Sequence, residues 1–131
     1  MQIVPYDTRT KVVVSIKPKR IGQSDVDAFL SEVRIAIDER RCIFHGTKKK
    51  NRDTLVALGL NTKEVYKEIA SLTYADYCYG PEPDNRSKYA DEEIWVFKKK
   101  VDWFTIYVKL KFAEFPEKKL VVLSFHEDNA Q

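Results

Sequence analysis

Four side chains that can transfer protons or bind anions cluster near the end of the sequence. Tyr107 and Lys109 alternate with apolar residues in the run FTIYVKLKF, and Ser124 and His126 end the run LVVLSFH. Successive side chains of a β-strand point to opposite faces, so each pair shares one face of its strand. An imidazole can act as acid or base near neutral pH, and an ammonium stabilises developing negative charge. The sequence therefore predicts a candidate site at His126, Tyr107 and Lys109.

The elements that must position these side chains are three predicted β-strands, at about residues 92–98, 103–112 and 119–126. β-Branched and aromatic residues dominate all three runs, and the middle run alternates between apolar and polar residues. With turns at 99–102 and 113–118, Trp95 and Phe125 both lie opposite Ile106 on an apolar face. A slip of one residue would turn this apolar set towards solvent. The polar side chains of the candidate site then share the opposite face.

Helices are predicted ahead of these strands, at about 25–40, at about 54–58 and from Asn61 onward. A short strand at 42–45 separates the first two helices, and a loop at 80–91, rich in Gly and Pro, precedes the sheet. This order of elements predicts an α+β fold, with an antiparallel β-sheet and helices packed on its apolar face. The other face of the sheet is left open.

Length and composition favour a single domain with a mild basic bias. The chain has 131 residues, 44% of them hydrophobic, and a formal net charge of +3. We divide it into a basic N-terminal extension at 1–20 and one domain at 21–131. No apolar run reaches the roughly 20 residues of a membrane helix and no signal peptide is visible, so we expect a cytoplasmic protein without membrane contact. Cys42 and Cys78 stand in no metal-binding spacing, so we expect neither a metal site nor a cofactor.

Two features point to a polyanion as partner. An open sheet face that carries Tyr, Lys, Ser and His side chains can serve as a platform for nucleic acid. The run Lys48–Arg52 is a second basic segment, which we interpret as a turn ahead of a short helix. It is either a solvated loop or a loop that contacts phosphates, and the sequence leaves both interpretations open.

Five motifs, in their order along the chain, resemble the MqsR family of bacterial toxins: LGL at Leu58–Leu60, LTYADY at Leu72–Tyr77, EIWVF at Glu93–Phe97, IYVKLK at Ile106–Lys111 and LSFHE at Leu123–Glu127. Members of that family are ribosome-independent mRNA endonucleases of the RelE superfamily. The resemblance covers somewhat more than half of the chain. It implies a RelE-like fold, mRNA as substrate, and a cognate MqsA-like antitoxin with a zinc-finger and a helix-turn-helix.

The resemblance also assigns individual residues. Tyr107 and Lys109 match a tyrosine and a lysine on the family's central strand, and the tyrosine is implicated in RNA cleavage. Three positions depart from the family pattern, which has lysine at Tyr79, glutamine at Val96 and lysine at His126. A histidine on the last strand is nevertheless similar to what several other RelE-superfamily nucleases use.

RNA can be cleaved without a metal when its own 2′-hydroxyl attacks the adjacent phosphate. This reaction needs a base, an acid for the leaving 5′-oxygen, and cations for the developing charge. We predict that His126 is the base or acid, that Lys109 stabilises the phosphorane, and that Tyr107 orients the phosphate or acts as the acid. The predicted RNA-binding residues are Lys111, Lys98, Lys99, Lys100, Tyr79, Lys48 and Lys49.

A non-catalytic RNA- or protein-binding module on the same RelE-like platform is the alternative. The departures at Tyr79 and Val96 permit it, because they fall within the set that cleaves RNA in the family. A neighbouring gene for a zinc-finger and helix-turn-helix protein would favour the toxin.

Overall fold

The computed structural model describes residues 19–88 and 91–128, so most of the predicted extension at 1–20 lies outside the described residues. The described elements are, in chain order, α1 (Gln23–Asp38), β1 (Cys42–Phe44), α2 (Lys49–Leu58), α3 (Thr62–Ala70), the 3₁₀ turn η1 (Tyr74–Asp76), β2 (Tyr77–Pro83), β3 (Glu93–Val101), β4 (Phe104–Ala113) and β5 (Lys119–Glu127). None of the described helices is long and apolar enough to cross a bilayer.

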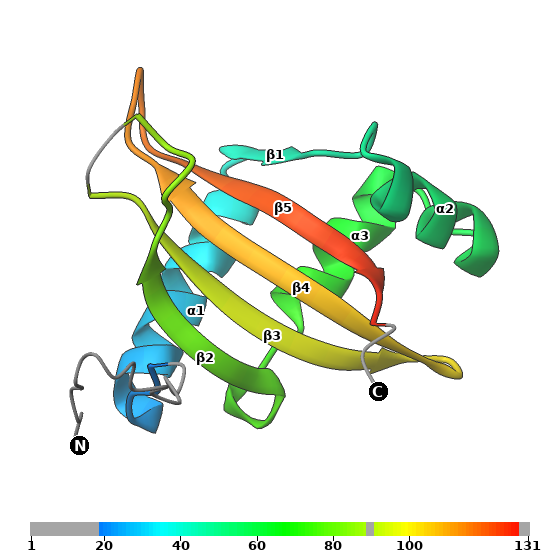
Figure 1. Ribbon diagram of the computed structural model, residues 1–131, viewed down its shortest axis with the longest axis horizontal. Coiled ribbons are helices and arrows are strands. Elements are labelled where there is room, and N and C mark those ends of the chain that lie inside the picture. The colour runs from blue at the N-terminus through cyan, green and yellow to red at the C-terminus, as the bar shows by residue number, and fades with distance from the viewer. Residues whose placement is uncertain (1–18, 89–90, 129–131) are drawn as a thin grey trace, which may run out of the picture.

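The strands form one sheet in the order β1-β5-β4-β3-β2, which places β4 at the centre (Figure 1). Strands β2 to β5 pair antiparallel, and β1 joins the edge of β5 in parallel, so the sheet is mixed. Helices α1 and α3 lie behind the sheet in the view of Figure 1, and α2 lies beyond the end of β1, next to β5. The predicted α+β class with helices on one sheet face is confirmed.

The core lies between α1, α3 and the apolar face of the sheet. The buried stripe of α1 has the spacing of a single helix face and consists of Val26, Phe29, Leu30, Val33 and Ala36. The ring of Phe29 stacks on that of Trp95 with centroids 4.0 Å apart. On β4, Ile106 and Val108 are fully buried, and burial of each such side chain contributes about 1.5–3 kcal/mol. This core makes β4 a rigid support for the residues on its other face.

The predicted pairing of β3 with β4 is wrong in register but right in face. Trp95 lies opposite Leu110 instead of Ile106, because β3 runs on to Val101 and the turn comprises only residues 102–103. Asp102 takes a φ of 55°, in a region that Asp tolerates better than most residues. The register differs by four residues, and an even shift leaves each side chain on its predicted face.

The pairing of β4 with β5 is also displaced. Phe125 lies opposite Val108, and the register shifts by one residue at Leu123, which forms a β-bulge. Upstream of the bulge, Val122 rather than Val121 therefore faces the core. Downstream of it, the faces are as predicted.

Residues 77–83 form an edge strand, whereas a loop was predicted from residue 80 onward. At Gly80 the backbone adopts a φ of 123°, and an added Cβ would lie 2.7 Å from the carbonyl oxygen of Ile94. The buried hydroxyl of Tyr77 donates to the carbonyl oxygen of Gly80 at 2.7 Å. Glycine and a buried tyrosine therefore bend this segment onto β3 despite its two prolines.

The basic run Lys48–Arg52, predicted as a turn, caps and begins α2. Asn51 is only 1% exposed: its amide donates to the carbonyl oxygen of Leu123 at 3.1 Å, and its oxygen accepts from the backbone N–H of Phe125 at 2.9 Å. Thr54 accepts from the backbone N–H of Glu127 at 2.9 Å. Polar side chains of α2 thus form hydrogen bonds with the backbone N–H and carbonyl groups of β5 beyond the end of β1.

Candidate active site

Tyr107 and His126 lie side by side on the sheet face that points away from α1 and α3. They are direct cross-strand partners on β4 and β5. Their rings stack with centroids 5.4 Å apart and planes inclined by 27°. Their predicted position on one face is confirmed, while their chemical role stays a prediction.

The phenol of Tyr107 is held protonated by its surroundings. Burial, and then a hydrogen bond with the hydroxyl of Tyr79 on β2, raise the pKa of Tyr107. Val96, the β3 partner of Tyr79, is 1% exposed, so the position where the resemblance implies glutamine carries a buried apolar side chain. Tyr107 therefore stays protonated, and able to donate a hydrogen bond, across the physiological pH range.

The imidazole of His126 has a defined orientation. Its Nδ1 lies 3.0 Å from the carbonyl oxygen of Glu127. A carbonyl oxygen only accepts hydrogen bonds, so this contact places a proton on Nδ1. In the neutral ring, Nε2 then carries the free lone pair and is able to accept a proton.

Lys109 lies one position further along the same face of β4, opposite Ser124 on β5 and Val96 on β3. Within the described part of the chain, its ammonium makes no ion pair with a carboxylate. Among the described residues, the Lys109 ammonium is therefore a cation on the same face as Tyr107 and His126 that remains available for a bound anion.

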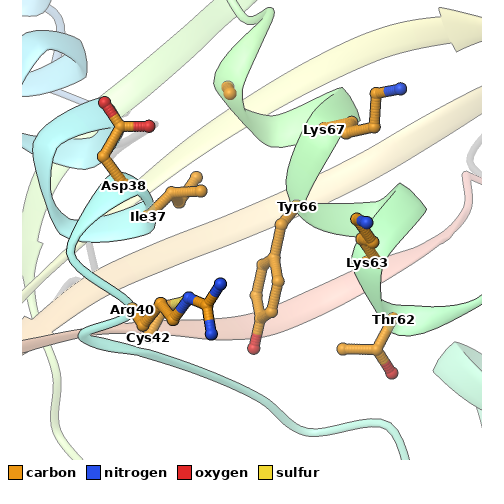
Figure 2. Close-up of a pocket in the computed structure, with 9 residues that line it drawn as sticks. Ile37, Asp38, Arg40, Cys42, Thr62, Lys63, Tyr66 and Lys67 are labelled. Carbon is orange, nitrogen blue, oxygen red and sulfur yellow. The ribbon is translucent and has the colours of Figure 1, made fainter.

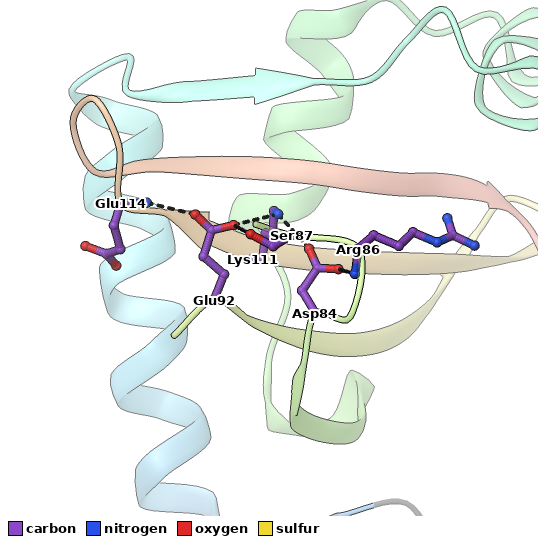
Figure 3. Close-up of polar contacts among 6 residues, drawn as sticks. All are labelled: Asp84, Arg86, Ser87, Glu92, Lys111 and Glu114. Carbon is purple, nitrogen blue, oxygen red and sulfur yellow. Dashed lines mark hydrogen bonds and ion pairs between the residues drawn. The ribbon is translucent and has the colours of Figure 1, made fainter. Parts of the chain in front are cut away.

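Lys111, predicted to bind RNA, is engaged in an internal network (Figure 3). Its ammonium lies 2.6 Å from a carboxylate oxygen of Asp84 and 2.8 Å from one of Glu92, and the Lys111 side chain is 13% exposed. Burial alone would raise the pKa of Glu92, but hydrogen bonds from Lys111, from Ser87 and from the backbone N–H of Glu114 outweigh it and lower the pKa. The geometry favours a structural role for Lys111, whose ion pairs hold the segment between β2 and β3 against the sheet.

The three lysines Lys98–Lys100 do not act together, because they belong to a strand rather than to a turn. Lys98 lies opposite Tyr107 and forms an ion pair of 2.9 Å with Asp128. Lys99, predicted to bind RNA, points to the helix face, with its ammonium 3.9 Å from a carboxylate oxygen of Glu68 on α3. Lys100 is exposed on the face that holds the site.

Lys48 and Lys49, at the start of α2, also point in different directions. The Lys48 ammonium donates to the carbonyl oxygen of Leu123 at 3.2 Å, at the bulge of β5. Lys49 pairs with Asp53 on the outer side of the helix and is 79% exposed. Only Lys48 therefore joins the face that carries Lys109.

A cleft of about 430 Å³ continues this face and includes residues that the sequence did not single out. Its walls include His45, Lys48, Arg86, Lys109 and Leu123. His45 follows the parallel strand β1, and Arg86 lies between β2 and β3. Both residues reach the cleft through contacts between segments far apart in the sequence, which no local sequence pattern predicts. Only the basic run that follows His45 gave a signal, because the segment around Arg86 carries acidic as well as basic residues.

A larger hollow, of about 720 Å³, lies between the end of α1, α3 and the start of β1 (Figure 2). Tyr66 projects into it from α3, and burial, followed by the neighbouring Cys42, raises the pKa of Tyr66 to about 12. None of the candidate site residues lines this hollow. The residues for which the sequence predicts chemistry therefore lie on the open sheet face and not in this hollow.

Residues 28–127 match the sequence profile of a protein family described as "Motility quorum-sensing regulator, toxin of MqsA". No curated protein and no solved structure matches the chain significantly. The matched segment spans most of the 131 residues and includes α2, α3 and all five strands. The chain belongs to the MqsR toxin family.

Proposed function

We propose that this toxin is a metal-independent endoribonuclease that cleaves mRNA in the cytoplasm by attack of the RNA 2′-hydroxyl. Membership of a toxin family supports a growth-inhibiting activity. The observation that carries the nuclease proposal is the stack of His126 on Tyr107, with Lys109 further along the same face of β4. Among the described residues, the Lys109 ammonium makes no ion pair and no helix covers this sheet face. A base, a proton donor and a cation are the three groups that this reaction needs.

The geometry suggests a role for each group. Nε2 of His126 takes the proton from the 2′-hydroxyl as that oxygen bonds to phosphorus. Tyr107, kept protonated by its raised pKa, gives its proton to the 5′-oxygen as the P–O5′ bond breaks. Lys109 stabilises the charge on the phosphorane. The products are a 2′,3′-cyclic phosphate and a 5′-hydroxyl.

Partners and domain layout follow from the same proposal. An MqsA-like antitoxin with a zinc-finger and a helix-turn-helix inhibits the toxin, whose RelE-like domain spans residues 21–131 behind a basic extension at 1–20. Lys48, Lys98 and Lys100 contact the RNA backbone from the site face. Lys99, Lys111 and Lys49 are left out, because their ammonium groups point to the helices, to a buried ion network and to the outside of α2.

Purified protein incubated with a synthetic RNA tests this function. We expect cleavage without ribosomes that persists in a chelator, together with growth arrest and mRNA loss when the protein is expressed in a bacterial host. Purified protein that leaves RNA intact, with and without ribosomes, would contradict the nuclease proposal.

The second candidate is a binding module without cleavage. Two observations favour it: Val96 is apolar and buried where the family has glutamine, and Asp128 neutralises Lys98. RNA binding that weakens with salt, without any cleavage, would identify an RNA-binding module. Absence of RNA binding at any salt would point to a protein-binding module.

A further inference from the structure

The cleft beside the candidate site gathers cations from three separate parts of the chain. Lys48 precedes α2, Lys109 lies on β4, and Arg86 lies between β2 and β3. Burial, then repulsion by Lys109 and Arg86, lower the pKa of Lys48, which lies in the same cleft as both. The fold keeps these three positive charges close together although they repel one another. A bound anion would reduce that repulsion.

The cations of the cleft are also available for a ligand. The Arg86 side chain extends away from the network around Lys111 (Figure 3), and within the described part of the chain neither Arg86 nor Lys109 makes an ion pair. The carboxylate of Asp84, which also lines the cleft, is occupied by Lys111 at 2.6 Å. The cleft therefore keeps a net positive charge and a planar guanidinium suited to two oxygens of one phosphate.

We propose that this cleft binds a backbone phosphate of the RNA strand next to the cleaved linkage, with Arg86, Lys48 and Lys109 as its ligands and His45 as a neighbouring donor. The proposal rests on the proposed function, since it extends the path of the RNA from Tyr107 and His126 along β4. Lys109 is shared by both sites. The cleft thus fixes the strand in register with the reacting phosphate.

The pKa of His45 gives a second way to detect a phosphate in the cleft. Its backbone N–H donates to Val122 at 3.1 Å, which fixes the residue at the end of β1. The charged groups around its side chain are Lys48 at the start of α2, Lys109 and Lys111 on β4, and Asp84 and Arg86 between β2 and β3. Burial, then Lys48 and Lys111, lower the pKa of His45 in the free protein. A phosphate in the cleft would favour the imidazolium and move this pKa upward.

The test uses the full chain and a 2′-O-methyl RNA octamer, which lacks the attacking hydroxyl and stays intact. Fluorescence anisotropy at several salt concentrations compares the wild type with Arg86→Gln and with the double variant Lys48→Gln/Arg86→Gln. The matched control is Lys63→Gln/Lys67→Gln, which removes the same charge from α3 behind the sheet. We expect the cleft double variant to bind at least about 10-fold more weakly and to lose about 0.7 from the slope of log K against log salt. The control should match the wild type.

Arg86→Gln alters an exposed side chain, so it reports on the cleft even if the Lys48 change disturbs α2. Cleft variants that bind as well as the control, or wild-type protein that does not bind the octamer, would overturn the phosphate site. A pKa of His45, followed by NMR, that does not rise when the octamer binds would also overturn it. Wild-type protein that binds the octamer through the cleft but fails to cleave the unmodified RNA would refute the nuclease and leave the phosphate site standing.

Discussion

The imidazole of His126 stacks on the phenol ring of Tyr107, with the two ring centroids 5.4 Å apart. The residues are paired across β4 and β5, so backbone hydrogen bonds hold their side chains together independently of any substrate. The hydroxyl of Tyr107 is further tied to Tyr79 on β2. An imidazole and a phenol are thereby held next to each other on one face of the sheet.

Tyr107→Phe separates the chemistry of this phenol from its packing. The ring and its stack with His126 remain, but the hydroxyl is lost, so we expect RNA cleavage to fall about 10²-fold while the free energy of unfolding changes by no more than about 1 kcal/mol. Tyr74→Phe, on the core side near η1, is the matched control and should cleave normally. Equal cleavage by the two variants would remove Tyr107 from the mechanism.

Two lysines on the same face of β4 should respond in opposite ways. Lys111→Gln leaves Asp84 and Glu92, whose side chains are 8% and 3% exposed, without their cation, so we expect a loss of about 3 kcal/mol in the free energy of unfolding. Lys109→Gln should leave that free energy unchanged and lower cleavage about 10²-fold. Urea unfolding and cleavage rates of both variants check this. Similar losses of stability in the two would contradict it.

The faces of the strands could be read from the sequence, whereas their registers could not. Alternation of apolar and polar residues fixes the face, and even register shifts preserve it, which is why Tyr107 and His126 fall together despite displaced pairing. The two-residue turn at 102–103 and the bulge at Leu123 set these registers. Neither can be predicted from the alternation of apolar and polar residues within one strand. The run 98–100 was predicted as a turn, but it belongs to β3. A strand points neighbouring side chains to opposite faces, so Lys99 lies on the face opposite to Lys98 and Lys100.

Long-range contacts account for the rest of the site. Asn51 was predicted to be part of a basic turn, yet it is buried against β5, and its hydrogen-bond partners on that strand lie more than seventy residues away in sequence. Lys111 reads as a solvent-facing strand residue until the segment between β2 and β3 folds over it. Composition alone cannot reveal either partner.

The buried ion network also predicts how stability depends on pH. Burial would raise the pKa values of Asp84 and Glu92, but hydrogen bonds that include those from Lys111 outweigh it and lower both. Carboxylates with lowered pKa values stabilise the fold above their ordinary pKa, near 4, and this stabilisation is lost as pH falls through the folded values. The difference in unfolding free energy between wild type and Lys111→Gln should therefore shrink as the pH falls below about 5. A difference that stays constant with pH would contradict the network's role.

Asn51 should be among the most sensitive polar residues for stability. Asn51→Ala leaves the N–H of Phe125 and the carbonyl oxygen of Leu123 without this partner, and a buried unsatisfied group costs about 1–3 kcal/mol. We expect a loss in that range by urea unfolding. Arg52→Ala, on the exposed side of the same helix, serves as the control and should stay within about 0.5 kcal/mol of the wild type. A loss in Asn51→Ala no larger than in this control would show that the bulge is held by other contacts.

The most direct test of the account is the cleavage rate of His126→Ala on a single synthetic RNA, measured with the chemistry of the product ends. With Nε2 of His126 as the base, the variant should remain folded and cleave about 10²–10⁴-fold more slowly than the wild type. The wild-type products should carry a 2′,3′-cyclic phosphate and a 5′-hydroxyl. Undiminished cleavage by folded His126→Ala, or products with a 5′-phosphate, would contradict the mechanism.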